Sequence, residues 1–98
     1  MAIYKNISSD TTSSPVTLIT KGSSGGNIRK ITIANHDDSD SNIINLHLYD
    51  GSSTFVLIET VIPARATLIL TDNLSFDVSI YNLRITTSST ADTTITIQ

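Results

Sequence analysis

The residues that could carry out catalysis are few and scattered along this chain of 98 residues. The two histidines, His36 and His47, fall in a predicted loop and a predicted strand, and Glu59 is the only glutamate. The sequence contains no Gly-x-Ser-x-Gly turn, no His-Glu-x-x-His pair and no glycine-rich phosphate loop that leads into a helix. A single glutamate also argues against the paired carboxylates of a glycosidase. We therefore expect a protein that is not an enzyme, with no catalytic residues and no cofactor.

An acidic stretch at 36–42 places Asp37, Asp38 and Asp40 among hydroxyl and amide side chains. Carboxylate oxygens are suitable ligands for Ca²⁺, which takes roughly six to eight of them. The stretch lacks the Asp-x-Asp-x-Asp-Gly spacing and the bidentate glutamate of an EF-hand loop, and acidic residues are equally typical of a solvated turn. A plain turn is the favoured interpretation and no metal site is assigned, while cation binding by these three aspartates is the alternative.

The remaining residues favour contact with other proteins. The predicted strand at 54–61 carries apolar residues on both faces, and such a strand is usually covered on both sides. The cover is either a loop or the N-terminal segment of the same chain, or a partner chain. The candidate interface residues are Ile3, Tyr4, Tyr49, Phe55 and Leu57.

Most of these residues are predicted to lie on β-strands, because apolar and polar side chains alternate along most of the chain. Eight short strands are predicted, at 2–7, 16–21, 27–35, 43–49, 54–61, 67–70, 77–86 and 93–98. Turn-forming residues separate them, and no window has the apolar spacing of a long helix. The pattern predicts an all-β fold: one antiparallel β-sandwich over 1–98, jelly-roll or immunoglobulin-like, of about eight short strands and with no long helix.

The alternation also predicts which side chains face the core. His47 is expected on the outer face. In the strand at 77–86 the pattern slips by one residue, which predicts a bulge or bend near 80–82. Residues 1–14 are a possible N-terminal arm and linker that pairs with a neighbouring chain. The predicted inward set is Ile31, Ile33, Ile44, Leu46, Leu48, Val56, Ile58, Ile62, Leu68, Leu70, Ile95 and Ile97.

Charge and composition exclude several classes of partner. The net charge is −3 and the six basic residues are scattered, whereas nucleic-acid binding needs a basic surface that displaces counterions. No cysteine is present for a disulfide or a thiolate metal site. No signal-peptide core and no apolar run of about 18 residues occurs. We expect no nucleic-acid partner and no membrane association, and a soluble chain made in a cytoplasm.

Four segments carry a resemblance to a known group of proteins. The chain reads Ile-x-Asn at 33–35, then x-Leu-x-Leu-x-Asp-Gly at 45–51, Ile-Pro-Ala-Arg-x-Thr-Leu at 62–68, and an Ile- and Leu-rich strand at 81–86. This order resembles the small β-sandwich virion structural proteins of tailed bacteriophages, of the marine and cyanophage type. The family turn has glycine where this chain has Arg65.

The resemblance implies a structural protein of the virion. The preferred interpretation is a capsid decoration (cement) protein that binds the major capsid protein or other virion proteins. Such a protein is expected to be a homo-oligomer, with a trimer as the expected state. The alternative is a tail, neck or fibre component that binds a host glycan, with Tyr49 beside Asp50 as its best aromatic platform. Either form places the protein in the virion after synthesis in the host cytoplasm.

Overall fold

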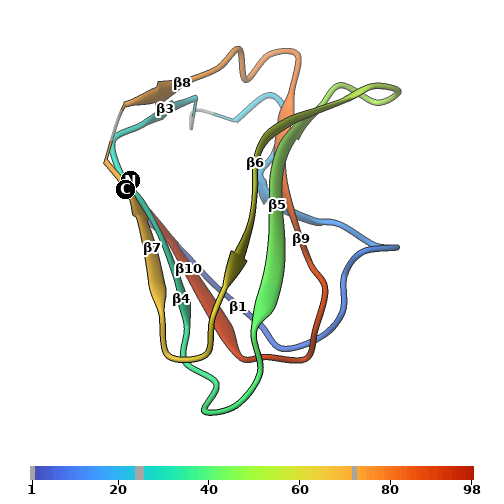
Figure 1. The fold of residues 1–98 in the computed structure, drawn as a ribbon. Helices are drawn as coiled ribbons and strands as arrows, with labels where there is room; N and C mark the ends of the chain where they lie inside the picture. Colours follow the sequence, from blue (N-terminus) through green and yellow to red (C-terminus); the bar gives the residue numbers. More distant parts are fainter. Residues whose placement is uncertain (1, 24–25, 72) are drawn as a thin grey trace.

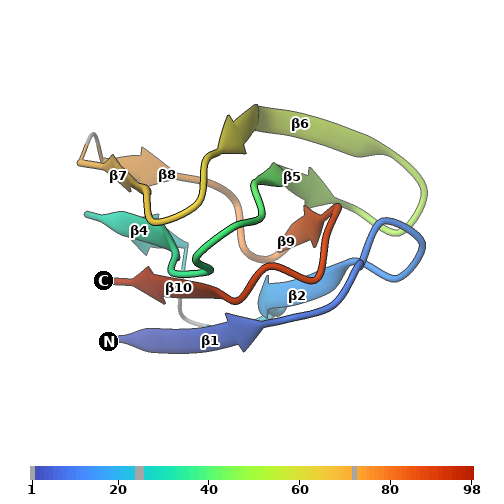
Figure 2. The same ribbon diagram turned by 60° about the horizontal axis from the view of Figure 1, so that its bottom comes forward.

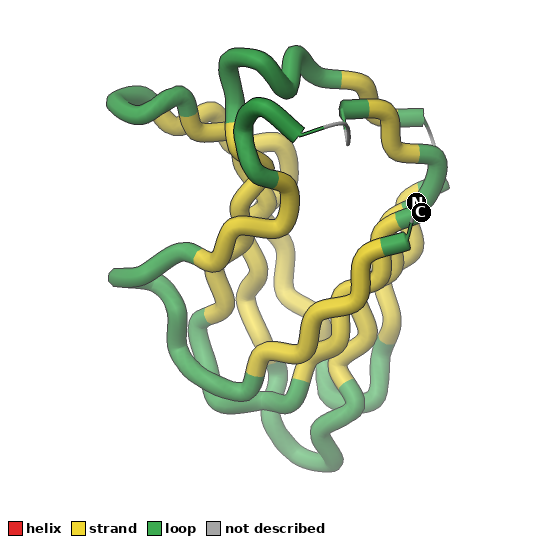
Figure 3. The backbone as a smooth tube through the Cα atoms, turned by 180° about the vertical axis from the view of Figure 1, so that it is seen from behind, coloured by secondary structure: helices red, strands yellow, loops and turns green. Residues whose placement is uncertain are grey.

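Two four-stranded antiparallel sheets pack face to face in the computed structural model, which describes residues 2–23, 26–71 and 73–98 (Figures 1 and 2). The described residues contain no helix (Figure 3). Sheet A has the order β1 (Ile3–Ile7), β10 (Thr93–Ile97), β4 (Ile31–Asn35), β7 (Thr67–Leu70). Sheet B has the order β2 (Val16–Ile19), β9 (Asn82–Thr87), β5 (Asn42–Tyr49), β6 (Thr54–Ile62). A small third sheet pairs β3 (Asn27–Ile28) with β8 (Leu74–Ser75). The predicted all-β antiparallel sandwich is confirmed.

The strand order decides between the two predicted architectures. Apart from the β5–β6 hairpin, neighbouring strands of the two four-stranded sheets come from distant parts of the chain, so that β10 lies between β1 and β4, and β9 lies between β2 and β5. Two four-stranded sheets interleaved in this way form a jelly roll. An immunoglobulin fold would group its strands differently.

The core consists of the inward side chains of both sheets. Ile95 is paired with Ile33, and Ile97 with Ile31, so their side chains share one face of sheet A. Ile44 and Leu46 of β5 face them from sheet B, and all six side chains are 0–1% exposed. The two-residue alternation therefore predicted these positions correctly.

One end of the sandwich interior is polar. The Asn35 amide nitrogen donates to the carbonyl oxygens of Asp40 (2.9 Å) and Ile62 (3.0 Å). The Asn42 amide nitrogen donates to the Thr93 hydroxyl at 3.0 Å. Every buried side-chain nitrogen and oxygen among the described residues has such a partner, which avoids the cost of an unsatisfied polar group.

Two predicted strands have different bounds. The segment 27–35 divides into β3 and β4, because the backbone N–H groups of Arg29 and Lys30 donate to the carbonyl of Gln98. In 77–86 the strand begins only at Asn82. The slip predicted to be a bulge or bend is a turn, in which the carbonyl of Asp77 accepts the backbone N–H groups of Ile80 and Tyr81.

A β-bulge in β6 overturns the predicted facing of Val56. Leu46 is paired with Ile58 and His47 with Val56, so Leu57 is the extra residue of β6. The bulge reverses the alternation, and Val56, predicted inside, is 55% exposed on the outer face. His47 lies on the outer face as predicted, but it is only 3% exposed because neighbouring side chains cover it.

The predicted N-terminal arm lies within this chain's own sandwich. β1 pairs antiparallel with β10 from Ile3↔Ile97 to Ile7↔Thr93 and forms one edge of sheet A. Met1 lies outside the described residues. Pairing of residues 1–14 with a neighbouring chain stays a prediction.

Candidate protein-binding surface

The five predicted interface residues do not form one surface. Ile3 packs against the core and Tyr4 is 69% exposed on β1 of sheet A. Phe55 (50% exposed) and Leu57 (37% exposed) lie on β6, at the opposite edge of the other sheet, close to Tyr49 at the end of β5. The structure brings together three of the five, on the β5–β6 hairpin.

Apolar side chains are exposed on the outer face of sheet B. Ile43 and Val61 are directly paired across β5 and β6 and are 47% and 54% exposed, and Val56 lies further along β6. We call Ile43, Val56 and Val61 the outer patch. No described loop covers it, and β1 lies at the far edge of the other sheet. Cover by the N-terminal segment is therefore wrong, and cover by a partner chain stays a prediction.

A chain of polar contacts crosses the same face. Arg84 Nε donates to His47 Nε2 (3.1 Å), His47 Nδ1 lies 2.9 Å from Asn45 Oδ1, and Asn45 Nδ2 donates to Glu59 Oε2 (2.8 Å). The Arg84 guanidinium also stacks over the ring of Tyr49, 3.8 Å from its centroid. Since His47 Nε2 accepts a hydrogen bond, Nδ1 carries the proton and donates to Asn45. Burial lowers the pKa of His47, and the charge of Arg84 lowers it further.

An apolar groove opens beside β6, between the edges of the two sheets. It has a volume of about 290 Å³ and only isoleucine and leucine side chains line it. Leu57 and Ile58 form one wall, and Leu70 of β7 and Leu74 of β8 stand opposite. The core is thus accessible from the side of the sandwich at which β6 and β7 have no further strand. The lining residues are Ile28, Ile31, Leu46, Leu57, Ile58, Leu70 and Leu74.

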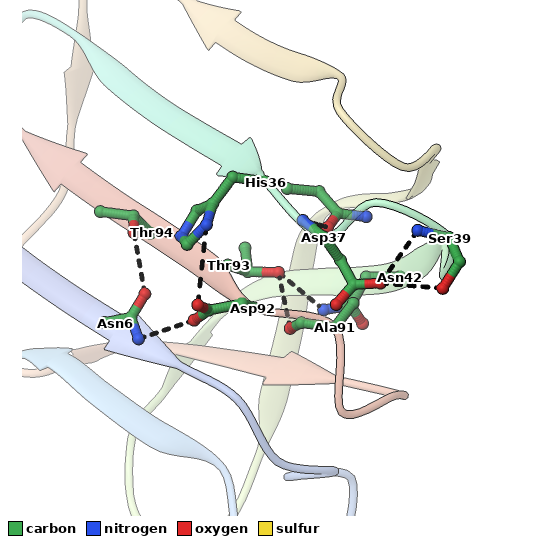
Figure 4. Close-up of polar contacts among 10 residues, drawn as sticks. Asn6, His36, Asp37, Ser39, Asn42, Ala91, Asp92, Thr93 and Thr94 are labelled. Atoms are coloured by element: carbon green, nitrogen blue, oxygen red, sulfur yellow. Dashed lines mark hydrogen bonds and ion pairs between the residues drawn. The ribbon is translucent and has the colours of Figure 1, made fainter.

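The acidic stretch forms a hydrogen-bonded turn. Asp37 Oδ2 accepts the backbone N–H groups of Asp40 (2.9 Å) and Ser39 (3.2 Å), and these bonds lower the pKa of the Asp37 carboxyl. Nearby, Asp92 accepts from Asn6 and lies 3.6 Å from His36 Nδ1 (Figure 4). Within the described ranges, no three histidine or carboxylate groups are placed to hold a metal ion. Asp37 thus has a structural role, and the alternative of cation binding by Asp37, Asp38 and Asp40 gains no support from the geometry of the described residues.

Sequence reasoning missed part of this surface. Ile43 precedes the inward Ile44 and falls on the outer face by alternation, but it was not among the candidate interface residues, and Val56 was placed on the wrong face. A pattern of alternation cannot reveal a bulge that arises from pairing with another strand. The signal that was present is the run of apolar residues on both faces of β6, with one charge in nine residues.

No known protein family matches the chain, and no curated protein matches it in sequence. Solved structures do share its fold. PirA aligns with a TM-score of 0.55 and 15% identity, over 98% of this chain and 90% of PirA. A pentameric capsid protein from metagenomic phage sequences aligns with a TM-score of 0.53 and 14% identity, over 99% of this chain. The Clostridium thermocellum xylanase 10B, a structure with CBM22-1 and GH10 modules, aligns with a TM-score of 0.50 and 12% identity.

These proteins differ in function, so the likeness defines the fold and not the activity. The chain spans 61% of the length of the phage capsid protein and 25% of the xylanase chain. The class defined here is a small jelly-roll domain that shares its fold with a phage capsid protein. The part of the chain that the structure describes holds no helix able to span a membrane.

Proposed function

We propose that this protein is a structural component of a bacteriophage virion, and that within the virion it is a capsid decoration (cement) protein. The outer patch carries this proposal, because Ile43, Val56 and Val61 remain about half exposed on a folded domain. Ile43 and Val61 adjoin each other, Val56 lies beyond the Asn45–Glu59 pair on the same face, and exposed apolar patches of this kind mark protein contact surfaces. Jelly rolls also occur among viral capsid proteins, and the four sequence motifs resemble those of small phage virion proteins.

In this proposal the outer patch packs against the lattice of the major capsid protein, and the protein performs no catalysis. Completing the burial of three half-exposed aliphatic side chains contributes on the order of 3 kcal/mol per copy before the costs of association. A contact of this size is modest for one molecule and large when many copies bind one shell. The proposal also includes two expectations from the resemblance: that the protein forms a trimer, and that the phage is of the marine or cyanophage type.

Attachment of variants to the capsid tests this role. The Ile43→Lys variant puts a charge in the outer patch, and we expect at least about tenfold weaker binding to capsid shells that lack the protein, measured by co-sedimentation. Tyr4→Lys is the matched control, since Tyr4 is 69% exposed on the other sheet. Equal binding by both variants and the wild-type chain would remove the outer patch as the attachment surface.

The number of copies in purified particles separates capsid from tail. Quantitative mass spectrometry should find hundreds of copies per particle for a cement protein, whereas a few tens or fewer would indicate a tail or neck component. Absence from the particles contradicts a virion role altogether. The mass of the isolated protein in solution tests the expected trimer.

A glycan-binding tail or fibre module is the second candidate. It is favoured by Phe55, half exposed and packed edge-on against Tyr81 with ring centroids 5.9 Å apart. Tyr49, the platform expected from the sequence, serves less well, because the Arg84 guanidinium occupies one face of its ring. Binding of the isolated domain to a glycan array, lost in Phe55→Ala, would favour this alternative.

A further inference from the structure

The four edge strands of the sandwich differ in how they are protected from pairing. Sheet A ends in β1 and β7, and sheet B ends in β2 and β6. An edge strand presents unpaired backbone N–H and C=O groups to any other strand, and proteins block such edges with short strands, bulges or charges that point inward.

Three of the edges carry such protection. β7 and β2 have four residues each, and the pairing of β2 is irregular between Thr17 and Ile19. β1 carries Lys5, which is paired with the fully buried Ile95 and therefore points to the inward side of sheet A. A strand added beside β1 would have to bury this ammonium group.

β6 is different. It is the longest strand in the described structure, with nine residues, and it lies at the end of sheet B with no strand beyond it (Figure 2). Its only charge is Glu59, and this carboxylate is already bonded to Asn45 on the outer face. The apolar groove opens along the same edge.

We propose that β6 pairs antiparallel with β6 of a second copy of this chain, about a two-fold axis at Thr60. The two copies of sheet B would then form one continuous sheet of eight strands. This contact does not require the virion role, because it uses only surfaces of the chain itself.

The alternation of side chains selects this register. Residues that are opposite in a strand pair must share a face, and Ile58, Thr60 and Ile62 face inward while Glu59 and Val61 face outward. A two-fold axis at Thr60 pairs Ile58 with Ile62 of the second copy, and Glu59 with its Val61. Each of the five residues from 58 to 62 then lies opposite a residue whose side chain points to the same face of the sheet, and no charge lies opposite a charge.

Other registers are worse. An axis at Glu59 places two carboxylates directly opposite each other, which is destabilising. An axis at Ile58 places outward Val56 against inward Thr60, because the bulge at Leu57 has reversed the alternation. The bulge therefore limits the pairing to the half of β6 from Ile58 to Ile62.

The size of the contact predicts its strength. Five paired residues span about 17 Å, and with the 18 Å smallest dimension of the molecule the contact covers roughly 300 Å² per copy, or about 600 Å² in total. Stable interfaces bury more than about 1,000 Å². The pairing is consequently weak between free molecules and becomes populated where copies are held close together.

Disulfide trapping tests the register directly, because the chain has no cysteine of its own. Glu59→Cys and Val61→Cys are prepared separately, then mixed at high concentration and oxidised. We expect at least about tenfold more mixed dimer than either variant forms alone, because opposite Cβ atoms are about 5 Å apart and diagonal ones about 7 Å, beyond disulfide reach. Thr60→Cys, on the axis, should link to itself and keeps the Glu59–Asn45 bond intact.

The matched control is the pair Tyr4→Cys and Asn6→Cys, two residues apart on the outer face of the β1 edge, where Lys5 blocks pairing. Circular dichroism verifies that each variant is folded. The proposal is overturned if the mixed dimer does not exceed this control and Thr60→Cys also fails to link. No capsid enters the experiment, so its failure is distinct from failure of the proposed function.

Discussion

Arg65 occupies a backbone conformation that suits glycine. Its φ is 62°, in the turn between β6 and β7 where the N–H of Ala66 donates to the carbonyl of Pro63. A residue with a Cβ is strained there by roughly 1–2 kcal/mol, and the phage proteins that the sequence motifs resemble have glycine at this place. The sequence motif thus identified the turn, and the positive φ explains why glycine suits this position.

Replacing Arg65 should therefore stabilise the fold. Arg65→Gly is expected to raise the free energy of unfolding by up to about 1 kcal/mol, less than the full strain because glycine also loses more entropy on folding. Urea denaturation measures the change. Arg65→Ala removes the same charge but keeps a Cβ, and a gain of the same size in this control would show that strain is not the cause.

His47 makes stability depend on pH. Its Nε2 accepts from Arg84, so a second proton on the ring would break that bond and place two positive charges together. Burial has lowered the pKa of His47 from 6.5. As the pH falls from about 6.5 towards this lowered pKa, the unfolded chain takes up a proton that the folded chain refuses, and the free energy of unfolding falls. Above about pH 6.5 this contribution is fully present.

The His47→Gln variant checks this assignment. Urea denaturation at about pH 7.5 and about pH 5.5 should show a loss of stability in the wild-type chain that is reduced in the variant. His36→Gln is the control, because His36 lies at the other end of the molecule beside Asp92 and its replacement leaves the His47 contribution in place. An unchanged pH dependence in His47→Gln contradicts the role of the network.

At the scale of the strand, the alternation of apolar and polar residues predicted which side chains face the core wherever the strand is regular. Ile31 and Ile33 alternate without interruption, and both face the core as expected. The bulge at Leu57 arises only from pairing with β5, so no reading of β6 alone could place Val56 correctly. The turn at Asp77 was hidden because Val78 and Ile80, which lie within it, continue the apolar alternation of a strand.

The β1 edge offers a prediction at the same scale. Lys5→Val removes the inward charge that blocks pairing at this edge, and valine suits a strand. We expect the variant to fold and to associate at lower concentration than the wild-type chain, as measured by sedimentation velocity. Lys21→Val, which removes the same charge from an exposed turn, is the control. Identical sedimentation of all three would show that Lys5 does not protect the edge.

At the scale of the molecule, composition and periodicity predicted a sandwich but left jelly-roll and immunoglobulin-like topologies open. Both have short alternating strands, and only the order of strands in the sheets separates them. The sequence likewise predicted some residues of the binding surface but not how they are grouped in space. Phe55 and Leu57 were named from sequence and are exposed, while their separation from Ile3 and Tyr4 depends on which edge of the sandwich each strand occupies.

The pairing of Ile3 with Ile97 also affects how the chain reaches its native state. During synthesis β1 has no partner until β10 has left the ribosome, and folds built on such distant contacts form in roughly milliseconds to seconds. In a crowded cell, this delay gives β1 time to meet the β10 of another nascent chain. Strand exchange during synthesis is thus a route to intertwined copies that is separate from any contact between finished molecules.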